Sequence, residues 1–214
     1  DEKKGLAGFL GQGAKALKGV RGRQLTAKEK DELERKKVTD HIQSIFDRTK
    51  ASVDKKLASL DDEVSRVFDR GTDAAIAKMK DYVESRFDDR YSGIIGKGRW
   101  LKDKLLPLPG SVKAWFDQAH KVFLQELDAL VVRVAELVER RLKEAKDEIA
   151  KGQKEIREYV AGLPAGLQAV GKAAEKEMQG QFDELRQGVD DKKNDLAQKL
   201  AQRYKDASEK GAKA

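Results

Sequence analysis

Residues 42 to 79, IQSIFDRTKASVDKKLASLDDEVSRVFDRGTDAAIAKM, carry apolar side chains in two rows with a spacing of eleven residues. One row is Ile42, Val53, Val64 and Ala75, and the other is Phe46, Leu57, Phe68 and Met79. Eleven residues make three turns at about 3.67 residues per turn, which is close to the natural α-helical period, so the apolar stripe stays nearly straight. The stretch therefore predicts a long, straight helix with one apolar face.

The same spacing returns twice further along the chain. Residues 123 to 160 contain the rows Phe123, Val134, Ala145, Ile156 and Leu127, Val138, Ile149, Val160. Residues 167 to 207 contain the rows Leu167, Met178, Val189, Leu200 and Ala174, Leu185, Leu196, Ala207. Three helices with matching stripes are expected to pack side by side along their length.

The composition favours the same architecture. Charged residues make up 39% of the 214 residues and aromatic residues only 6%, so little bulky apolar material is present to fill a thick core. Strong helix formers are abundant, and there are three prolines and no cysteine. We therefore predict an all-α fold: an elongated antiparallel three-helix bundle with long, nearly straight helices and a short connector helix that contains tryptophan and proline.

Capping residues and breakers bound the expected helices. Thr26 and Glu29 form a capping-box sequence at the start of the first helix, and Ser111 is a suitable N-cap for the second long helix. The run Gly162-Leu163-Pro164 ends that helix and starts the third. The helices are expected at about residues 26 to 91, 98 to 106, 111 to 161 and 164 to 208, all within one domain of residues 26 to 214.

Short connections between the long helices predict antiparallel neighbours. Facing residue numbers should sum to about 202 between the first and second long helices, and to about 327 between the second and third. This register places residue 162 beside residue 40, so residues 27 to 40 are expected to project past the bundle. Gly71 and Gly152 are the candidate kinks within the long helices.

The N-terminal segment, residues 1 to 25, differs from the bundle. Residues 1 to 23 contain six cations against two anions, and Leu6, Phe9, Leu10 and Leu17 can share one helical face. One interpretation is an amphipathic basic arm that lies on an anionic membrane or binds a partner. The other is a flexible linker, because five glycines among residues 5 to 19 weaken a helix in water.

The stretch IIGKGRWLKDKLLPLPGSVKAWF, residues 94 to 116, holds both tryptophans and two of the three prolines. It could form a rigid plug that folds over the end of the bundle, or a tip that inserts at a membrane interface beside its own lysines and arginine. In either interpretation the contacting side chains are Trp100, Leu101, Leu105, Leu106, Trp115 and Phe116.

Several classes of function lack support in the sequence. His41 and His120 are the only histidines, and neither has a second ligand at metal-binding spacing. The sequence has no glycine-rich phosphate loop and no nucleophile elbow, and its charges are interleaved instead of forming a basic stripe. We expect no enzyme activity, no catalytic or metal-ligating residue, no cofactor, no nucleic-acid partner and no small-molecule substrate.

Three phrases carry a resemblance to a known class of proteins: YVESRFDDRYSGIIGKGRW (residues 82 to 100), LPGSVKAWFDQ (108 to 118) and AKDEIAKGQKEIREYVAGLP (145 to 164). This part of the chain resembles a helical region of large modular bacterial toxin-like proteins associated with extracellular contractile injection systems. The resemblance implies a non-catalytic scaffold or interaction module inside a longer bacterial polypeptide that is secreted or delivered.

The same resemblance implies that the partners are other domains of the parent protein, or another protein. It maps no active-site residue onto this chain. The alternative function is a membrane-active module, in which the N-terminal arm and the Trp-Pro connector engage an anionic membrane.

Overall fold

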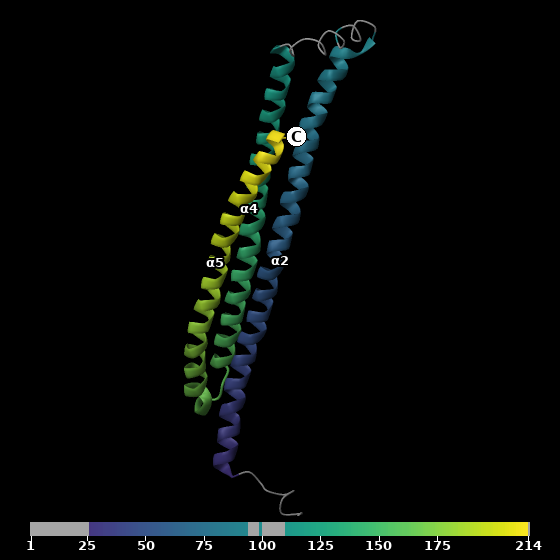
Figure 1. Ribbon diagram of the computed structural model, residues 1–214. Coiled ribbons are helices and arrows are strands. Elements are labelled where there is room, and N and C mark those ends of the chain that lie inside the picture. Colours follow the sequence, from purple (N-terminus) through teal and green to yellow (C-terminus); the bar gives the residue numbers. More distant parts are fainter. Residues whose placement is uncertain (1–25, 94–98, 100–109, 214) are drawn as a thin grey trace, which may run out of the picture.

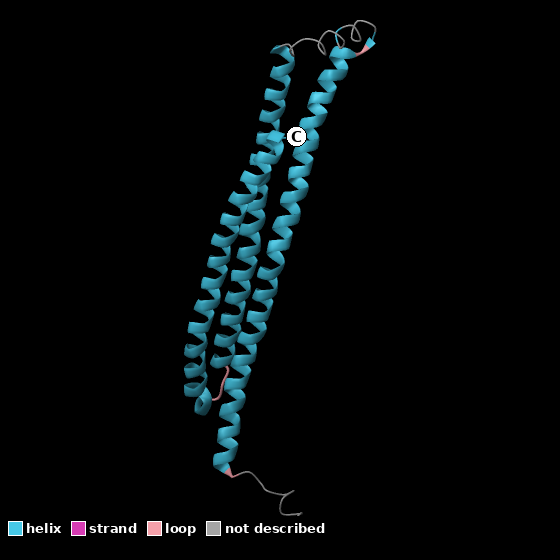
Figure 2. Cartoon of the chain, viewed as in Figure 1, coloured by secondary structure: helices cyan, strands magenta, loops and turns pink. Residues whose placement is uncertain are grey.

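The computed structural model describes residues 26 to 93, residue 99 and residues 110 to 213. Three long helices, α2 (Ala27–Tyr91), α4 (Gly110–Ala161) and α5 (Gln168–Lys213), are accompanied by a 3-10 turn, η1 (Ala165–Leu167). They lie side by side in a long, narrow bundle (Figure 1), and no strand occurs in these ranges (Figure 2). The all-α helical bundle is confirmed, whereas the connector helix expected at residues 98 to 106 lies outside the described residues, apart from Arg99.

Cross-helix ion pairs fix the direction and register of α2 and α4. The pairs are Arg48 with Glu155, Glu63 with Arg141, and Lys78 with Glu126. The residue number rises along α2 as it falls along α4, so these helices are antiparallel. Every pair lies within two residues of the register expected from the sequence.

The register of α5 against α4 differs from the expected one. Lys146 pairs with Asp190, and the Tyr204 hydroxyl donates to Asp128, so facing residues in these two antiparallel helices sum to about 334 and not to 327. The difference arises because Pro164 does not start α5 directly. The turn η1 comes first, closed by the Leu167 N–H donating to the Pro164 carbonyl at 2.8 Å, and it moves the hairpin tip along the chain.

The core is a thin layer that runs along all three helices. Val64, Val138 and Val189, one from each helix, have at most 8% of their surface exposed. All but four of the positions in the six apolar rows are buried, and the remaining four leucines are half-buried and pack against the core: Leu57, Leu167, Leu185 and Leu200. The apolar stripes thus meet along the length of the bundle.

The helix starts follow the sequence only in part. The capping box is present, since Thr26 Oγ1 accepts from the Glu29 N–H at 3.3 Å and the Thr26 N–H donates to the Glu29 carboxylate at 2.7 Å. That backbone hydrogen bond lowers the pKa of Glu29. The N-cap prediction for Ser111 is wrong, because Gly110 already takes helical geometry and places Ser111 inside α4.

The expected overhang of α2 is present and slightly shorter than expected. Residues 27 to 37 are exposed and Val38 is the first buried side chain, and α2 extends past the tip of the α4/α5 hairpin (Figure 1). Ion pairs within the helix, such as Arg35 with Asp31 at 2.7 Å and Lys37 with Glu34 at 2.7 Å, support this segment.

The two glycines expected to kink the helices serve a packing role. Both α2 and α4 remain helical through Gly71 and Gly152. A Cβ at Gly71 would lie 2.3 Å from Leu130 Cδ1, and one at Gly152 would lie 2.4 Å from Thr49 Oγ1. Hydrogen at these positions therefore allows α2 and α4 to approach closely.

The contact at Gly71 makes a testable prediction about stability. In Gly71→Ala the new methyl group overlaps Leu130, which is 2% exposed and has no room to move, so the free energy of unfolding should fall by about 1–2 kcal/mol despite the better helix propensity of alanine. Gly188→Ala in α5 is the control, because the space around Gly188 is open. Its free energy of unfolding should rise by about 0.5–1 kcal/mol. Urea unfolding followed by circular dichroism measures both, and a stabilised Gly71→Ala variant would contradict the close approach.

Two carboxylates in the bundle are held by cations from another helix. Arg141 on α4 donates two hydrogen bonds to Glu63 at 2.9 and 3.0 Å, and this interaction lowers the pKa of Glu63. Lys192 on α5 hydrogen-bonds to Asp61 and lowers the pKa of that carboxyl as well. Both ionised carboxylates stabilise the bundle relative to the unfolded chain.

The lowered pKa values predict the direction of the pH dependence. The stabilisation is fully present above about pH 5, where both carboxyls are ionised even in the unfolded chain, and it is lost as the pH falls through the lowered folded-state values. In Glu63→Gln the free energy of unfolding should be lower at neutral pH and should decline less on acidification. Asp54→Asn, which removes only a pair within α2, is the control. An acid-induced decline that Glu63→Gln leaves unchanged would contradict this assignment.

Candidate interaction surface at the end of the bundle

Four aromatic side chains gather where α2 ends and α4 begins. The ring of Phe87 lies 5.5 Å from Tyr91, 5.8 Å from Trp115 and 6.2 Å from Phe116, measured between ring centroids. These distances are typical of stacked and edge-to-face aromatic contacts. We call this group, Phe87, Tyr91, Trp115 and Phe116, the aromatic end.

Helix geometry explains why these residues meet. Phe87 and Tyr91 are four residues apart on α2 and therefore share one face of the helix. In the antiparallel register shown by the α2/α4 ion pairs, Phe87 faces residues 115 and 116 of α4. The aromatic end thus follows from one helical spacing and one register.

The aromatic end is partly open to solvent and carries a positive charge. Phe116 has 46% of its surface exposed, while Phe87, Tyr91 and Trp115 are half-buried. The Arg90 guanidinium lies 5.5 Å from the centroid of the Tyr91 ring and 5.8 Å from that of Trp115. Exposed aromatic rings with an adjacent arginine are the side chains that protein interfaces favour.

A groove of about 830 Å³, lined by apolar and charged side chains, adjoins the aromatic end. Its apolar lining includes Met79 and Val83 of α2 and Phe116 and Ala119 of α4, and Gly211 of α5 also borders it. Gly211 packs closely on Phe123, since a Cβ there would lie 2.2 Å from the Phe123 ring. Phe116 lines this groove and is also one of the four residues of the aromatic end.

The structure brings together two of the residues singled out from the sequence. Trp115 and Phe116 lie together at the surface. The connector side chains Trp100, Leu101, Leu105 and Leu106, and the arm side chains Leu6, Phe9, Leu10 and Leu17, lie outside the described residues.

The sequence reasoning missed Phe87, Tyr91 and Arg90. The available signal was the four-residue spacing of the two rings, combined with the register of the first two long helices. The expected register places Phe87 opposite Trp115, but no composition or motif signal distinguishes Phe87 from the other apolar residues of the first helix.

The two histidines lie against aromatic rings. His41 packs against Tyr159 with ring centroids 4.2 Å apart, and His120 against Phe123 at 6.2 Å. Within the described residues, no group of three or more histidine, cysteine, aspartate or glutamate side chains could hold a metal ion. None of the described helices is both long and apolar enough to cross a membrane.

The comparisons with known proteins add no relative. The chain matches no protein-family model, no curated protein and no solved structure.

The two phenylalanines of the aromatic end are predicted to have different roles. Phe87→Ala removes the ring that touches the other three and should lower the free energy of unfolding by about 1–3 kcal/mol. Phe116→Ala removes an exposed ring and should change it by no more than about 0.5 kcal/mol. Chemical denaturation of both variants checks the contrast. Equal destabilisation by both would mean that Phe116 is a structural residue and not an available contact.

Proposed function

We propose that this chain is a non-catalytic helical scaffold and interaction module of a larger bacterial toxin-like or injection-system-associated protein. The observation that carries the proposal is the continuity of α2. It runs for 65 residues, and its buried side chains extend from Val38 to Met79. That interval corresponds to roughly 60 Å of continuous core at 1.5 Å per residue. Such a core suits a rigid rod that keeps the domains or partners bound at its two ends apart.

The apolar rows support the scaffold role. Because each stripe returns after eleven residues, the helices can stay in contact without strong supercoiling, and the rod stays straight. Lys192 of α5 lies beside Asp61 of α2, which is 33 residues beyond Lys28. Lys193 follows Lys192 in the sequence, so the rod would hold Lys28 and Lys193 about 50 Å apart along its axis.

The interaction role is assigned to the aromatic end. Phe116 is exposed, Trp115 is half-buried, and Arg90 covers the rings of Trp115 and Tyr91. Aromatic and arginine side chains supply much of the binding energy in protein interfaces. The partner proposed here is another domain of the parent protein, or a separate protein, and the injection-system context rests on the resemblance of the chain from about residue 82 onward.

A spin-label distance tests the scaffold directly. The chain has no cysteine, so Lys28→Cys with Lys193→Cys gives two specific labelling sites on exposed residues. Pulsed electron paramagnetic resonance should give a narrow distribution of distances between the two spin labels, centred at about 50 Å. A broad distribution, or one centred below about 30 Å, would contradict a rigid rod.

The membrane-active alternative is favoured by the arginine and the exposed ring beside Trp115, since aromatic and basic side chains suit a membrane interface. Flotation with vesicles of anionic and zwitterionic phospholipids separates the two proposals. The scaffold proposal predicts that the full chain stays unbound at low salt. Flotation that is lost in Phe116→Ser, or on removal of residues 1 to 25, would replace the scaffold with the membrane-active function.

A further inference from the structure

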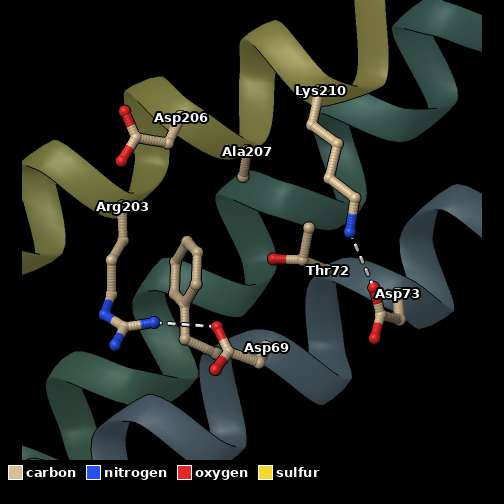
Figure 3. A pocket seen from close by; sticks show the side chains of 8 residues that line it. Asp69, Thr72, Asp73, Arg203, Asp206, Ala207 and Lys210 are labelled. Carbon is tan, nitrogen blue, oxygen red and sulfur yellow. Dashed lines mark hydrogen bonds and ion pairs between the residues drawn. The ribbon is translucent and has the colours of Figure 1, made fainter. Parts of the chain in front are cut away.

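Three ion pairs between α2 and α5 join acids of α2 to bases of α5. Asp61, Asp69 and Asp73 of α2 pair with Lys192, Arg203 and Lys210 of α5. Figure 3 shows two of these pairs, Arg203 with Asp69 at 2.7 Å and Lys210 with Asp73 at 3.0 Å. We call these three pairs the acid-base seam.

The seam weakens toward the end of α5. The Lys192 side chain is 19% exposed, and its partner Asp61 also accepts from Lys199 at 3.3 Å. In the two later pairs the Asp69, Lys210 and Asp73 side chains are more than 60% exposed, whereas Arg203 is 35% exposed and also donates to Ser65 at 2.8 Å. Exposed ion pairs contribute little and are screened by salt, so these two hold α5 only weakly.

Apolar anchoring of α5 also ends early. Its large buried side chains are Met178, Phe182, Val189 and Leu196. Beyond Leu196 the buried residues of α5 are only alanine and glycine, while Leu200 and Tyr204 are half-buried. The remaining links to α4 are small, since the Tyr204 hydroxyl donates to Asp128 at 2.8 Å and Gly211 packs on the Phe123 ring. Residues 197 to 213 therefore bury little apolar surface.

Two grooves that are open to solvent border this part of α5. An opening of about 450 Å³ lies between Phe68 and Thr72 of α2 and Ala207 of α5, and it is shown in Figure 3. Thr72 is only 5% exposed, yet its hydroxyl oxygen has no hydrogen-bond partner among the described residues. A second opening of about 620 Å³ lies beside Val64 and Leu196. Solvent-filled grooves leave α5 with fewer packed neighbours along its sides, which lowers the free energy needed to separate the helices.

We propose that residues 197 to 213 of α5 form a detachable arm, which separates from α2 and α4 as a unit while residues 168 to 196 stay in the bundle. The arm is held by the two exposed pairs of the acid-base seam, by the pair of Lys199 with Asp61, by the Arg203–Ser65 and Tyr204–Asp128 hydrogen bonds, and by the packing of Gly211 on Phe123. Its detachment uncovers Phe68, which lines the opening, and Phe123, on which Gly211 packs. This property goes beyond the scaffold role, because it makes one end of the rod responsive to ionic strength.

Hydrogen exchange of the full chain, read by mass spectrometry, tests the proposal. Amides of residues 197 to 213 should exchange faster than those of residues 174 to 196. Raising NaCl from about 0.05 M to about 0.5 M should accelerate the exchange of the arm by about three- to tenfold, and leave that of residues 174 to 196 nearly unchanged.

Paired variants separate the seam from ordinary fraying of a helix end. Asp69→Asn with Asp73→Asn should accelerate exchange of the arm at low salt and reduce its salt response, leaving only the pair of Lys199 with Asp61. Asp40→Asn with Asp54→Asn removes the same charge from pairs within α2 and should have neither effect. Uniform protection along α5 would overturn the proposal. Fast exchange of the arm that responds neither to salt nor to the seam variants would also overturn it.

Discussion

Each long helix buries one narrow apolar stripe, and the spacing of that stripe decides the shape of the molecule. Because 39% of the residues are charged, the chain can bury only a thin layer of side chains. A stripe that returns after three full turns stays on one side of its helix, so burial requires contact along the whole length. Val64, Val138 and Val189 supply this contact from three helices, at 3%, 8% and 0% exposure. The elongated shape of the bundle and the overhang of α2 both follow from this constraint.

The sequence predicted the register of α2 with α4 but not that of α5 with α4. The apolar rows explain the failure. The two apolar rows of α5 are offset by seven residues. Sliding α5 along α4 by seven residues therefore places one row where the other had been, and apolar burial alone supports both the expected and the observed register. The pairs Lys146 with Asp190 and Tyr204 with Asp128 fit only the observed register, and the turn η1 supplies the length that it requires. The sequence rows could not rank these alternatives.

Tertiary shape also decided the roles of the glycines. Gly71 and Gly152 look like weak points when a helix is considered alone. In the bundle they lie against Leu130 and Thr49, and these neighbours cannot be identified before the register is known. The candidate site depended on the same information. Trp115 and Phe116 could be singled out from the composition of their segment. Phe87 could be identified only from the antiparallel packing, which brings its ring into contact with both.

Small-angle X-ray scattering of the full chain tests the central claim most directly, because it measures shape without labels or substitutions. A bundle as long as the 65-residue helix α2 should give a maximum dimension of at least about 95 Å and a radius of gyration above about 25 Å. A radius of gyration near 17 Å, as expected for a compact domain of 214 residues, would contradict the account.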